Sequence, residues 1–244
     1  MFSPREAELE RGWPGRVDGD RVVQLAAQTL EAFFTGGGGA REHAEYPLDE
    51  VEFRPPVLHP SSVRVFSALE RHDAPFFSFR NTGPVFGHEA EVPYPAGTAE
   101  LDLGLAVAAV VGADGAIGGV TLANDWTARD LERAERASGF GPSKSKDFAL
   151  SLGPVLVTPD ELEGTARVRA RVNGEGRGGF DLEALAYSWR ELAEHAARNT
   201  ELRPGELLVC TAGQTGEPWL EPGDVVELEL AAVGVLRNAV APAA

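Results

Sequence analysis

The chain has 244 residues, of which 43% are hydrophobic and 25% charged, as in an ordinary globular protein with a sizeable core. Its 38 acidic and 22 basic residues give a formal net charge of −16, which repels phosphate backbones and anionic membranes. We therefore expect neither nucleic acid nor a membrane as a partner. No apolar run approaches the ~18 residues of a membrane span, and no signal-peptide core follows Met1. A single cysteine, Cys210, fits a reducing compartment, so the expected location is cytoplasmic.

The N-terminal region predicts a small unit of its own. Asp18 and Gly19 lie between short apolar runs, a pattern typical of a hairpin with a type I′ turn. Apolar residues at helical spacing then predict a short helix over residues 25–34. Proline-rich sequence separates this part from the next, with a boundary near residues 58–61. We expect two units: a small N-terminal module over residues 1–60 and a main domain over residues 61–244.

Strands dominate the prediction for the main domain. Helices are expected over residues 127–137, with Thr127 as the N-cap, and over residues 182–198. Residues 83–95 are rich in glycine and proline and predict a loop. The expected fold class is α+β and β-rich, with mixed sheets and no regular alternation of strand and helix. Strands are predicted over these segments: residues 50–57, 62–66, 101–111, 117–122, 155–157, 166–172, 206–210 and 225–233.

Three side chains stand out as candidates for chemistry. Asp125 follows a predicted strand and precedes a predicted helix, where backbone N–H groups can keep a carboxylate ionised; it can equally be a simple helix cap. Lys146 lies in a loop broken by glycine and proline, where a solvated lysine is the plainer interpretation. His72 is expected on a helical turn and can be an ordinary surface histidine. No spacing of a zinc site, a nucleophile elbow or a dinucleotide-binding loop is present in the sequence.

Four segments carry distinctive motifs: NDWTARDLE, GPSKSKDFALSLGPVLVT, VNGE before a tryptophan-bearing helix, and PWLEPGDVVELEL with GVLRN after it. Together they resemble the fumarylacetoacetate hydrolase superfamily, and the early RVDGDRVVQLAAQTLEAFFTGGG resembles the small leading domain of many bacterial members. The resemblance implies a mixed β-roll, usually homodimeric. It also implies an enzyme that hydrolyses, decarboxylates, hydrates or isomerises a dicarbonyl or 2-oxo acid.

The resemblance assigns roles to the three candidates. Typical members bind Mg²⁺ or Ca²⁺ through several carboxylates, and Asp125 matches the last of these by position. Lys146 matches a lysine on the substrate side, and His72 matches the catalytic histidine. The segment after residues 211–213 lacks a close counterpart of the glutamate that usually partners this histidine.

The other metal-binding carboxylates of the family are missing from the matching positions. Val65 stands seven residues before His72, where an acid is usual, and Gly104 and Ala106 replace two glutamates on the central strand. Sliding the register to use Glu100 and Asp102 as those acids breaks an otherwise good match. We expect these six residues to bind substrate: Val65, Ser78 (in place of a common tyrosine), Gly104, Ala106, Arg129 and Glu132.

These replacements have a physical consequence. Mg²⁺ requires near-octahedral oxygen ligands, and Asp125 alone makes a poor site for it. Small apolar replacements give a drier and roomier cavity, which suits a bulkier apolar ligand. Without a metal, Asp125 needs another cation, and Lys146 is the natural candidate. No cofactor is expected, unless a rebuilt site takes Mg²⁺ or Ca²⁺.

Three hypotheses follow from the sequence. The first is an enzyme for a dicarbonyl or 2-oxo/enol substrate that works without metal, by cyclisation, isomerisation or C–C cleavage, using His72, Asp125 and Lys146 for proton transfer. The second is a metal-dependent hydrolase or decarboxylase with substitute ligands drawn from Glu70, Glu100 or Asp102. The third is a non-catalytic relative that binds a ligand or partner.

Overall fold

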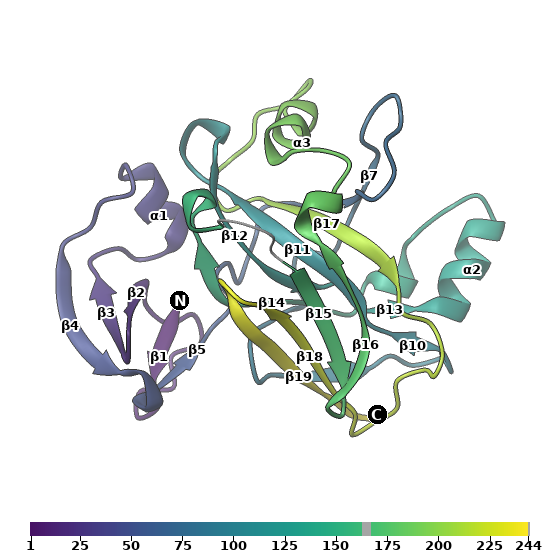
Figure 1. Cartoon of the computed structure of the whole chain (residues 1–244), viewed down its shortest axis with the longest axis horizontal. Helices are drawn as coiled ribbons and strands as arrows, with labels where there is room; N and C mark the ends of the chain where they lie inside the picture. Colours follow the sequence, from purple (N-terminus) through teal and green to yellow (C-terminus); the bar gives the residue numbers. More distant parts are fainter. Residues whose placement is uncertain (163–166, 244) are drawn as a thin grey trace.

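The computed structural model describes residues 1–162 and 167–243 and is built on two large sheets packed face to face (Figure 1). The larger sheet has seven strands in this order: β7 (Phe77–Phe79), β6 (Val63–Ser67), β17 (Leu207–Gln214), β11 (Gly104–Val111), β12 (Ile117–Asn124), β14 (Leu150–Val157) and β8 (Val85–Phe86). The second has five: β16 (Glu175–Asp181), β15 (Arg167–Val172), β18 (Val225–Leu230), β19 (Gly234–Ala243) and β9 (Glu91–Tyr94). Both sheets mix parallel and antiparallel pairs, which confirms the β-rich mixed fold.

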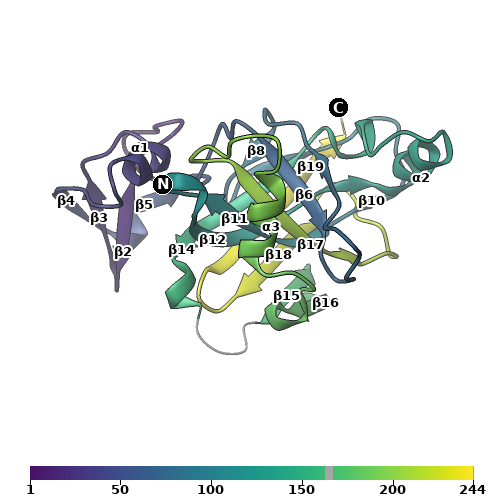
Figure 2. The same ribbon diagram turned by 90° about the horizontal axis from the view of Figure 1, so that it is seen from above.

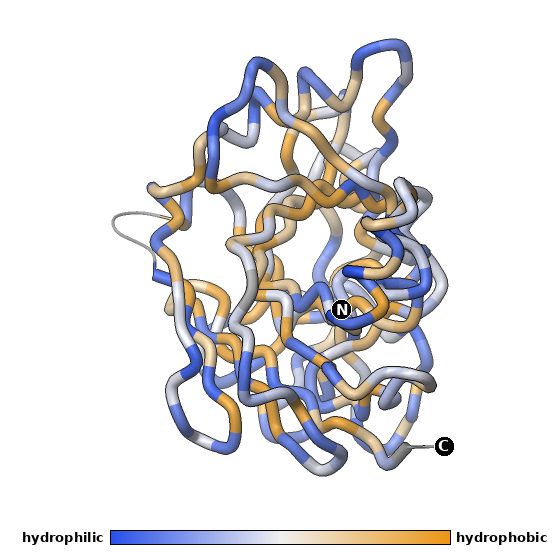
Figure 3. The backbone as a smooth tube through the Cα atoms, turned by 90° about the vertical axis from the view of Figure 1, so that its right-hand side faces the viewer, coloured by the Kyte–Doolittle hydropathy of each residue, from blue (hydrophilic) through white to orange (hydrophobic). Residues whose placement is uncertain are grey.

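The central strand β11 is buried on both faces. Leu105 and Val107 alternate with Ala106 and Ala108, so each face of the strand contributes to a separate apolar cluster. One cluster fills the space between the two large sheets, and the other lies on the outer face of the larger sheet. Two buried faces explain the continuous apolar run in the sequence. Hydrophobic stretches accordingly run through the middle of the molecule in Figure 3.

The N-terminal region forms its own small sheets. β2 (Gly15–Asp18), β3 (Arg21–Leu25) and β4 (Glu42–Pro47) pair in one, and β1 (Phe2–Pro4) pairs with β5 (Val51–Phe53) in another. Figures 1 and 2 both show this unit at the opposite end of the molecule from helix α2 (Arg129–Ala137). Phe34 of helix α1 (Leu30–Thr35) packs into the outer cluster of the larger sheet. The boundary near residue 60 stays a prediction.

The remaining elements are short. β10 (Leu101–Asp102) pairs with β13 (Thr127–Ala128), and α3 (Trp189–Ala196) begins at a capping box of Ser188 and Glu191. None of the helices in the described part of the chain is long and apolar enough to cross a membrane. The described part of the chain also contains short 3₁₀ turns: η1 (Leu48–Glu50), η2 (Ala113–Gly115), η3 (Lys144–Lys146), η4 (Pro159–Glu161) and η5 (Leu182–Ala184).

Several boundaries predicted from the sequence were wrong. The segment expected as a loop over residues 83–95 contributes β8 and β9 to the sheet edges, because backbone pairing overrides its glycines and prolines. The helix predicted over residues 25–34 begins only at Leu30, after the side chain of Thr29 accepts from the N–H of Ala32. The long helix predicted over residues 182–198 is split into η5 and α3. Of the strand predicted over residues 166–172, residue 166 lies outside the described part.

Two hairpin turns differ in backbone geometry. Asn173 and Gly174 both have positive φ, as the tight hairpin between β15 and β16 requires. The first hairpin, between β2 and β3, also forms. Its two turn residues are Gly19 and Asp20, and only Gly19 has positive φ, so the type I′ turn predicted there was wrong.

A candidate active site with an internal ion pair

A cavity of about 410 Å³ opens where β6, β7, β11 and β12 end beside η3 and α2. Seven of the nine residues predicted for the site from the sequence lie in its lining: Val65, Ser78, Gly104, Asp125, Arg129, Glu132 and Lys146. The predicted His72 and Ala106 are not among the described residues that line it.

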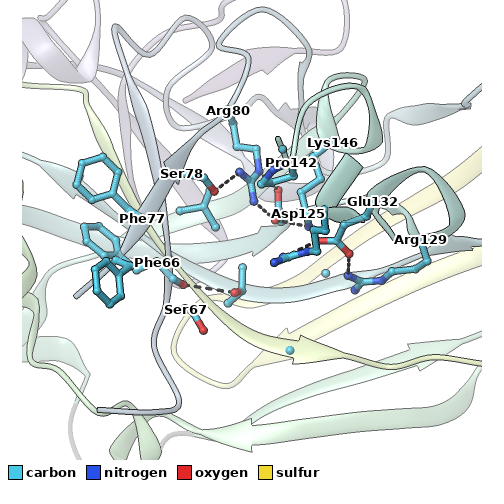
Figure 4. A pocket seen from close by; sticks show the side chains of 17 residues that line it. Phe66, Ser67, Phe77, Ser78, Arg80, Asp125, Arg129, Glu132, Pro142 and Lys146 are labelled. Atoms are coloured by element: carbon cyan, nitrogen blue, oxygen red, sulfur yellow. Dashed lines mark hydrogen bonds and ion pairs between the residues drawn. The ribbon is translucent and has the colours of Figure 1, made fainter. Parts of the chain in front are cut away.

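Asp125 is the centre of this site and is completely buried. Its Oδ1 accepts a hydrogen bond from Nε of Arg80 at 2.9 Å, and its Oδ2 accepts one from Nη2 of the same guanidinium at 3.0 Å. Lys146 Nζ donates to Oδ2 at 2.9 Å, as Figure 4 shows. The predicted pairing of Lys146 with Asp125 is therefore confirmed, and Arg80 is an additional cation that the sequence analysis missed.

The local chain path explains how Asp125 reaches these partners. Asn124 accepts from the backbone N–H of Gly104 at 2.7 Å, and Asp125 donates its own N–H to the carbonyl of Gly104 at 3.0 Å. Thr127 was expected to cap the helix, but it lies in β13, and its hydroxyl accepts from Lys146 Nζ at 2.5 Å. Helix α2 begins two residues later without a side-chain cap. Asp125 is thus held by side-chain cations and not, as expected, by a helix N-terminus.

Opposing effects set the pKa of each group in this pair. Burial alone raises the pKa of Asp125, but the charges of Lys146 and Arg80 and their hydrogen bonds outweigh it and bring the pKa to about 2. Burial lowers the pKa of Lys146, and the attraction of Asp125 only partly opposes this. Asp125 is therefore a firmly ionised carboxylate, while the pKa of Lys146 is lowered from the ordinary value of a lysine.

A second ionic group forms the neighbouring wall. Arg129 donates from Nε to Asp102 at 2.8 Å and from Nη1 to Glu132 at 2.8 Å, and Glu132 also accepts from Arg136 at 3.0 Å. Burial alone raises the pKa of Glu132, but Lys146 and the two arginines hold it below its ordinary value. The described lining residues therefore combine four cations with two carboxylates, in a chain whose formal net charge is −16.

The oxygen atoms around Asp125 are not suited to bind a divalent cation. Both of its oxygens already accept from Arg80 or Lys146, and both oxygens of Glu132 accept from arginines. A metal ion there would lie against two fixed positive charges, and Mg²⁺ or Ca²⁺ needs several free oxygen ligands. Across the described part of the chain, no three histidine, cysteine or acidic side chains gather as a metal-binding group.

The proposed substitute ligands are also engaged elsewhere. Asp102 is buried, with its oxygens bonded to Arg129 at 2.8 Å and to Thr215 at 2.5 Å. Glu100 forms a salt bridge with Arg133 at 2.7 Å, and Glu70 is exposed on a loop. Asp102 and Glu100 pair with side chains around the pocket, and Glu70 lies on the surface, so none of the three acids joins Asp125 in a shared site.

Neither His72 nor Ala106 is among the described lining residues, although the His72 ring packs beside Phe76 at the cavity mouth. His72 is exposed in an irregular segment, not on a helical turn; its backbone N–H donates to the hydroxyl of Tyr187 at 2.6 Å, and its ring lies 5.8 Å from that of Phe76. Ala106 is fully buried in the outer apolar cluster. Their roles in catalysis and substrate binding stay predictions.

Comparison with known proteins assigns the chain to a family. A family profile described as fumarylacetoacetate (FAA) hydrolase C-terminal matches residues 54–241, more than half of the chain. The chain belongs to the fumarylacetoacetate hydrolase family. An oxaloacetate tautomerase of Bacillus subtilis (strain 168) is 27% identical over 225 residues, which cover 79% of this chain and 74% of that protein.

Solved structures agree on the fold. A fumarylacetoacetate hydrolase from psychrophilic Exiguobacterium antarcticum superposes with a TM-score of 0.82 at 22% identity, covering 95% of this chain and 96% of the other. A 2-keto-3-deoxy-D-arabinonate dehydratase complexed with magnesium and 2,5-dioxopentanoate gives 0.80 at 19% identity, covering 96% and 97%. These two likenesses show that the fold is shared.

The low pKa of Asp125 predicts a specific acid sensitivity. The unfolded chain takes up a proton at this residue near pH ~3.9, whereas the folded protein resists down to a pKa of about 2. The ion pair therefore contributes stability above about pH 4 that is lost as the pH falls toward 2, about 2 kcal/mol in total. Urea unfolding measured between about pH 5 and 3 should show that the free energy of unfolding falls more steeply as the pH decreases. An Asp125→Asn variant with the same pH slope would contradict it.

Proposed function

We propose that this protein is an enzyme that moves a proton on an anionic 2-oxo acid or its enol, such as a keto–enol tautomerisation, without a metal at Asp125. The observation that supports this most directly is the buried ion pair of Asp125 with Arg80 and Lys146 on the wall of a cavity whose lining carries excess positive charge. The relationship to an oxaloacetate tautomerase supports the same class of reaction.

Substrate binding follows from the hydrogen-bond donors that remain. Lys146 has three N–H groups and donates two of them, to Asp125 and Thr127, in the described structure. Arg129 uses Nε and Nη1 for protein acceptors, which leaves its other terminal nitrogen for a ligand among the described contacts. A carboxylate and the adjacent 2-oxo oxygen of a substrate are suited to such donors.

Lys146 is the group we assign to proton transfer. Efficient general acid–base catalysis needs a pKa near the working pH. The two carboxylates of the lining have lowered pKa values and are weak bases, whereas burial lowers the pKa of Lys146 from the ordinary value of a lysine. Arg80 and Asp125 then act as a fixed charge pair: Asp125 orients the amine, and Arg80 stabilises negative charge that develops on the enolate oxygen.

Replacing Lys146 tests this assignment. We expect Lys146→Gln to lower the rate of enol-to-keto conversion by about 10²- to 10⁴-fold, because the group that moves the proton is gone. The reaction can be followed by the ultraviolet absorbance of the enol of small 2-oxo acids, with excess EDTA throughout. Lys144→Gln is the matched control: Lys144 is 81% exposed in its side chain, pairs with Asp147, and does not line the cavity.

The outcomes separate the competing functions. Activity that survives EDTA but not Lys146→Gln supports the proposal. Activity abolished by EDTA and restored by Mg²⁺ points to the metal-dependent hydrolase or decarboxylase with substitute ligands, and contradicts the metal-free site. Ligand binding without turnover of any 2-oxo acid points to a non-catalytic member of the family. A His72→Ala variant in the same assay shows whether that loop residue takes part.

A further inference from the structure

The cavity has two chemically different halves. The ionic half holds Arg80, Asp125 and Lys146, with the wall of Arg129 and Glu132 beside it. The other half is apolar. Figure 4 shows the rings of Phe66 and Phe77 together on the side away from the ionic groups. Its apolar lining residues are Val65, Phe66, Phe76, Phe77 and Pro142.

Ring packing fixes the inner part of the aromatic half, at Phe66 and Phe77. The ring centroids of Phe66 and Phe77 are 5.2 Å apart, and Phe77 packs edge-on against Phe79 at 5.4 Å. The Arg64 guanidinium lies 5.9 Å from the centroid of the Phe77 ring, and this arginine is fixed in turn by a buried salt bridge with Glu206. A preformed apolar wall binds a ligand without the cost of ordering side chains.

Two of the three hydroxyl groups near this half, those of Ser78 and Thr211, bond to protein partners. Ser78 accepts from Arg80 at 2.7 Å and so belongs to the ionic half. Thr211 donates to the carbonyl of Phe66 at 3.4 Å. Ser67 lies at the exposed rim, where water can serve it. No cationic side chain among the described lining residues belongs to the aromatic half, so a second carboxylate placed there would lose its hydration without gaining a partner.

The mouth of the cavity extends the apolar surface. Phe76 lines the cavity and is 66% exposed, far more than a core aromatic residue. The cavity volume of about 410 Å³ falls within the ~300–1,000 Å³ typical of sites for ligands much larger than a four-carbon acid. An apolar substituent on the substrate would cover the ring of Phe76, which is otherwise in contact with water.

From this division we infer that the substrate is amphipathic: a 2-oxo acid or enol that carries an aromatic or branched aliphatic group, not a short acid with a carboxylate at each end. The 2-oxo carboxylate lies at Lys146 and Arg129, and the apolar group packs against Phe76 and Phe77, with the fully buried Phe66 behind them. This inference rests on the proposed function for its ionic half and adds the chemical class of the rest of the substrate.

Calorimetry with a matched pair of acids tests the inference without requiring turnover. In EDTA, 4-phenyl-2-oxobutanoate is expected to bind about 10- to 100-fold more tightly than 2-oxoglutarate, because burial of one ring has about that effect on affinity. Both probes carry the same 2-oxo carboxylate and differ in the group at the far end. Phe77→Ser should remove most of this preference, whereas Lys146→Gln should weaken both acids to a similar extent.

Phe140→Ser provides the control, because Phe140 is 79% exposed and is not among the described residues that line the cavity. It should leave the preference unchanged. Equal or tighter binding of 2-oxoglutarate by the unmodified protein overturns the inference while leaving the anion site intact, and so does a preference that survives Phe77→Ser. If neither acid binds, the proposed function itself is wrong, and the amphipathic substrate with it.

Discussion

Asp125→Asn is expected to destabilise the protein by about 3–5 kcal/mol, the cost of removing one partner from a buried ion pair. The side chains of Arg80 and Lys146 are only 6% and 8% exposed, so the substitution leaves two neighbouring, nearly buried cations without the carboxylate that both of them bind. Urea unfolding near neutral pH measures the loss. The deficit should shrink as the pH rises, because Lys146 can then lose its proton.

A surface pair provides the control for this substitution. Arg167 and Asp181 form a salt bridge of the same 2.9 Å length as the Arg80–Asp125 contact, but their side chains are 46% and 45% exposed. Asp181→Asn should therefore change the free energy of unfolding by at most about 1 kcal/mol. If Asp125→Asn costs no more than this control, the buried charge cluster does not have the stabilising role assigned to it.

Gly104→Glu, which restores an acid common in the family, is expected to damage the site without creating a metal centre. A Cβ atom at Gly104 would lie 2.1 Å from the carbonyl oxygen of Asp125, and backbone atoms cannot give way as a flexible side chain can. The two segments must separate, which breaks the bonds that position Asp125. We expect a loss of about 3 kcal/mol or more in the free energy of unfolding.

The measurements are urea unfolding and titration with Mn²⁺ followed by calorimetry. Gly104→Ala should already show most of the destabilisation, since the first carbon causes the clash. Gly176→Ala is the matched control, because a Cβ there meets nothing within 4 Å and the position lies in a strand. A stable Gly104→Glu protein that binds Mn²⁺ stoichiometrically would refute both the steric argument and the metal-free site.

The sequence predicted the fold class and half of the ion cluster. Asp125 and Lys146 stand in short, distinctive motifs, so their juxtaposition was foreseen from about twenty residues of chain. Arg80 was missed because its partner lies 45 positions away and nothing in the local sequence around it signals a buried charge. The missing acids at Val65 and Gly104 indicated that Asp125 needed a cation as its partner. They did not indicate that a second cation would come from Arg80, the residue after the edge strand β7.

The errors in secondary structure have a related cause. Threonine is a common helix cap, but Thr127 pairs with β10, and its hydroxyl accepts a hydrogen bond from Lys146. Tertiary contacts therefore decide its role. Glu100 and Asp102 looked like spare acids, whereas Arg133 and Arg129 neutralise them. Such pairings depend on side chains that meet only in the folded chain, and local propensity carries no information about them.

The segment Asn124–Thr127 has a consequence for motion. Its four consecutive side chains bond to different parts of the protein: Asn124 to Gly104, Asp125 to Arg80, Trp126 to Ser151 at 2.9 Å, and Thr127 to Lys146. Local unfolding of the segment Asn124–Thr127 would break all of these contacts together, so this segment is among the last parts of the fold to fluctuate. The motion that admits and releases a ligand therefore occurs at the exposed rim around Phe76, while the segment that holds Asp125 keeps its conformation.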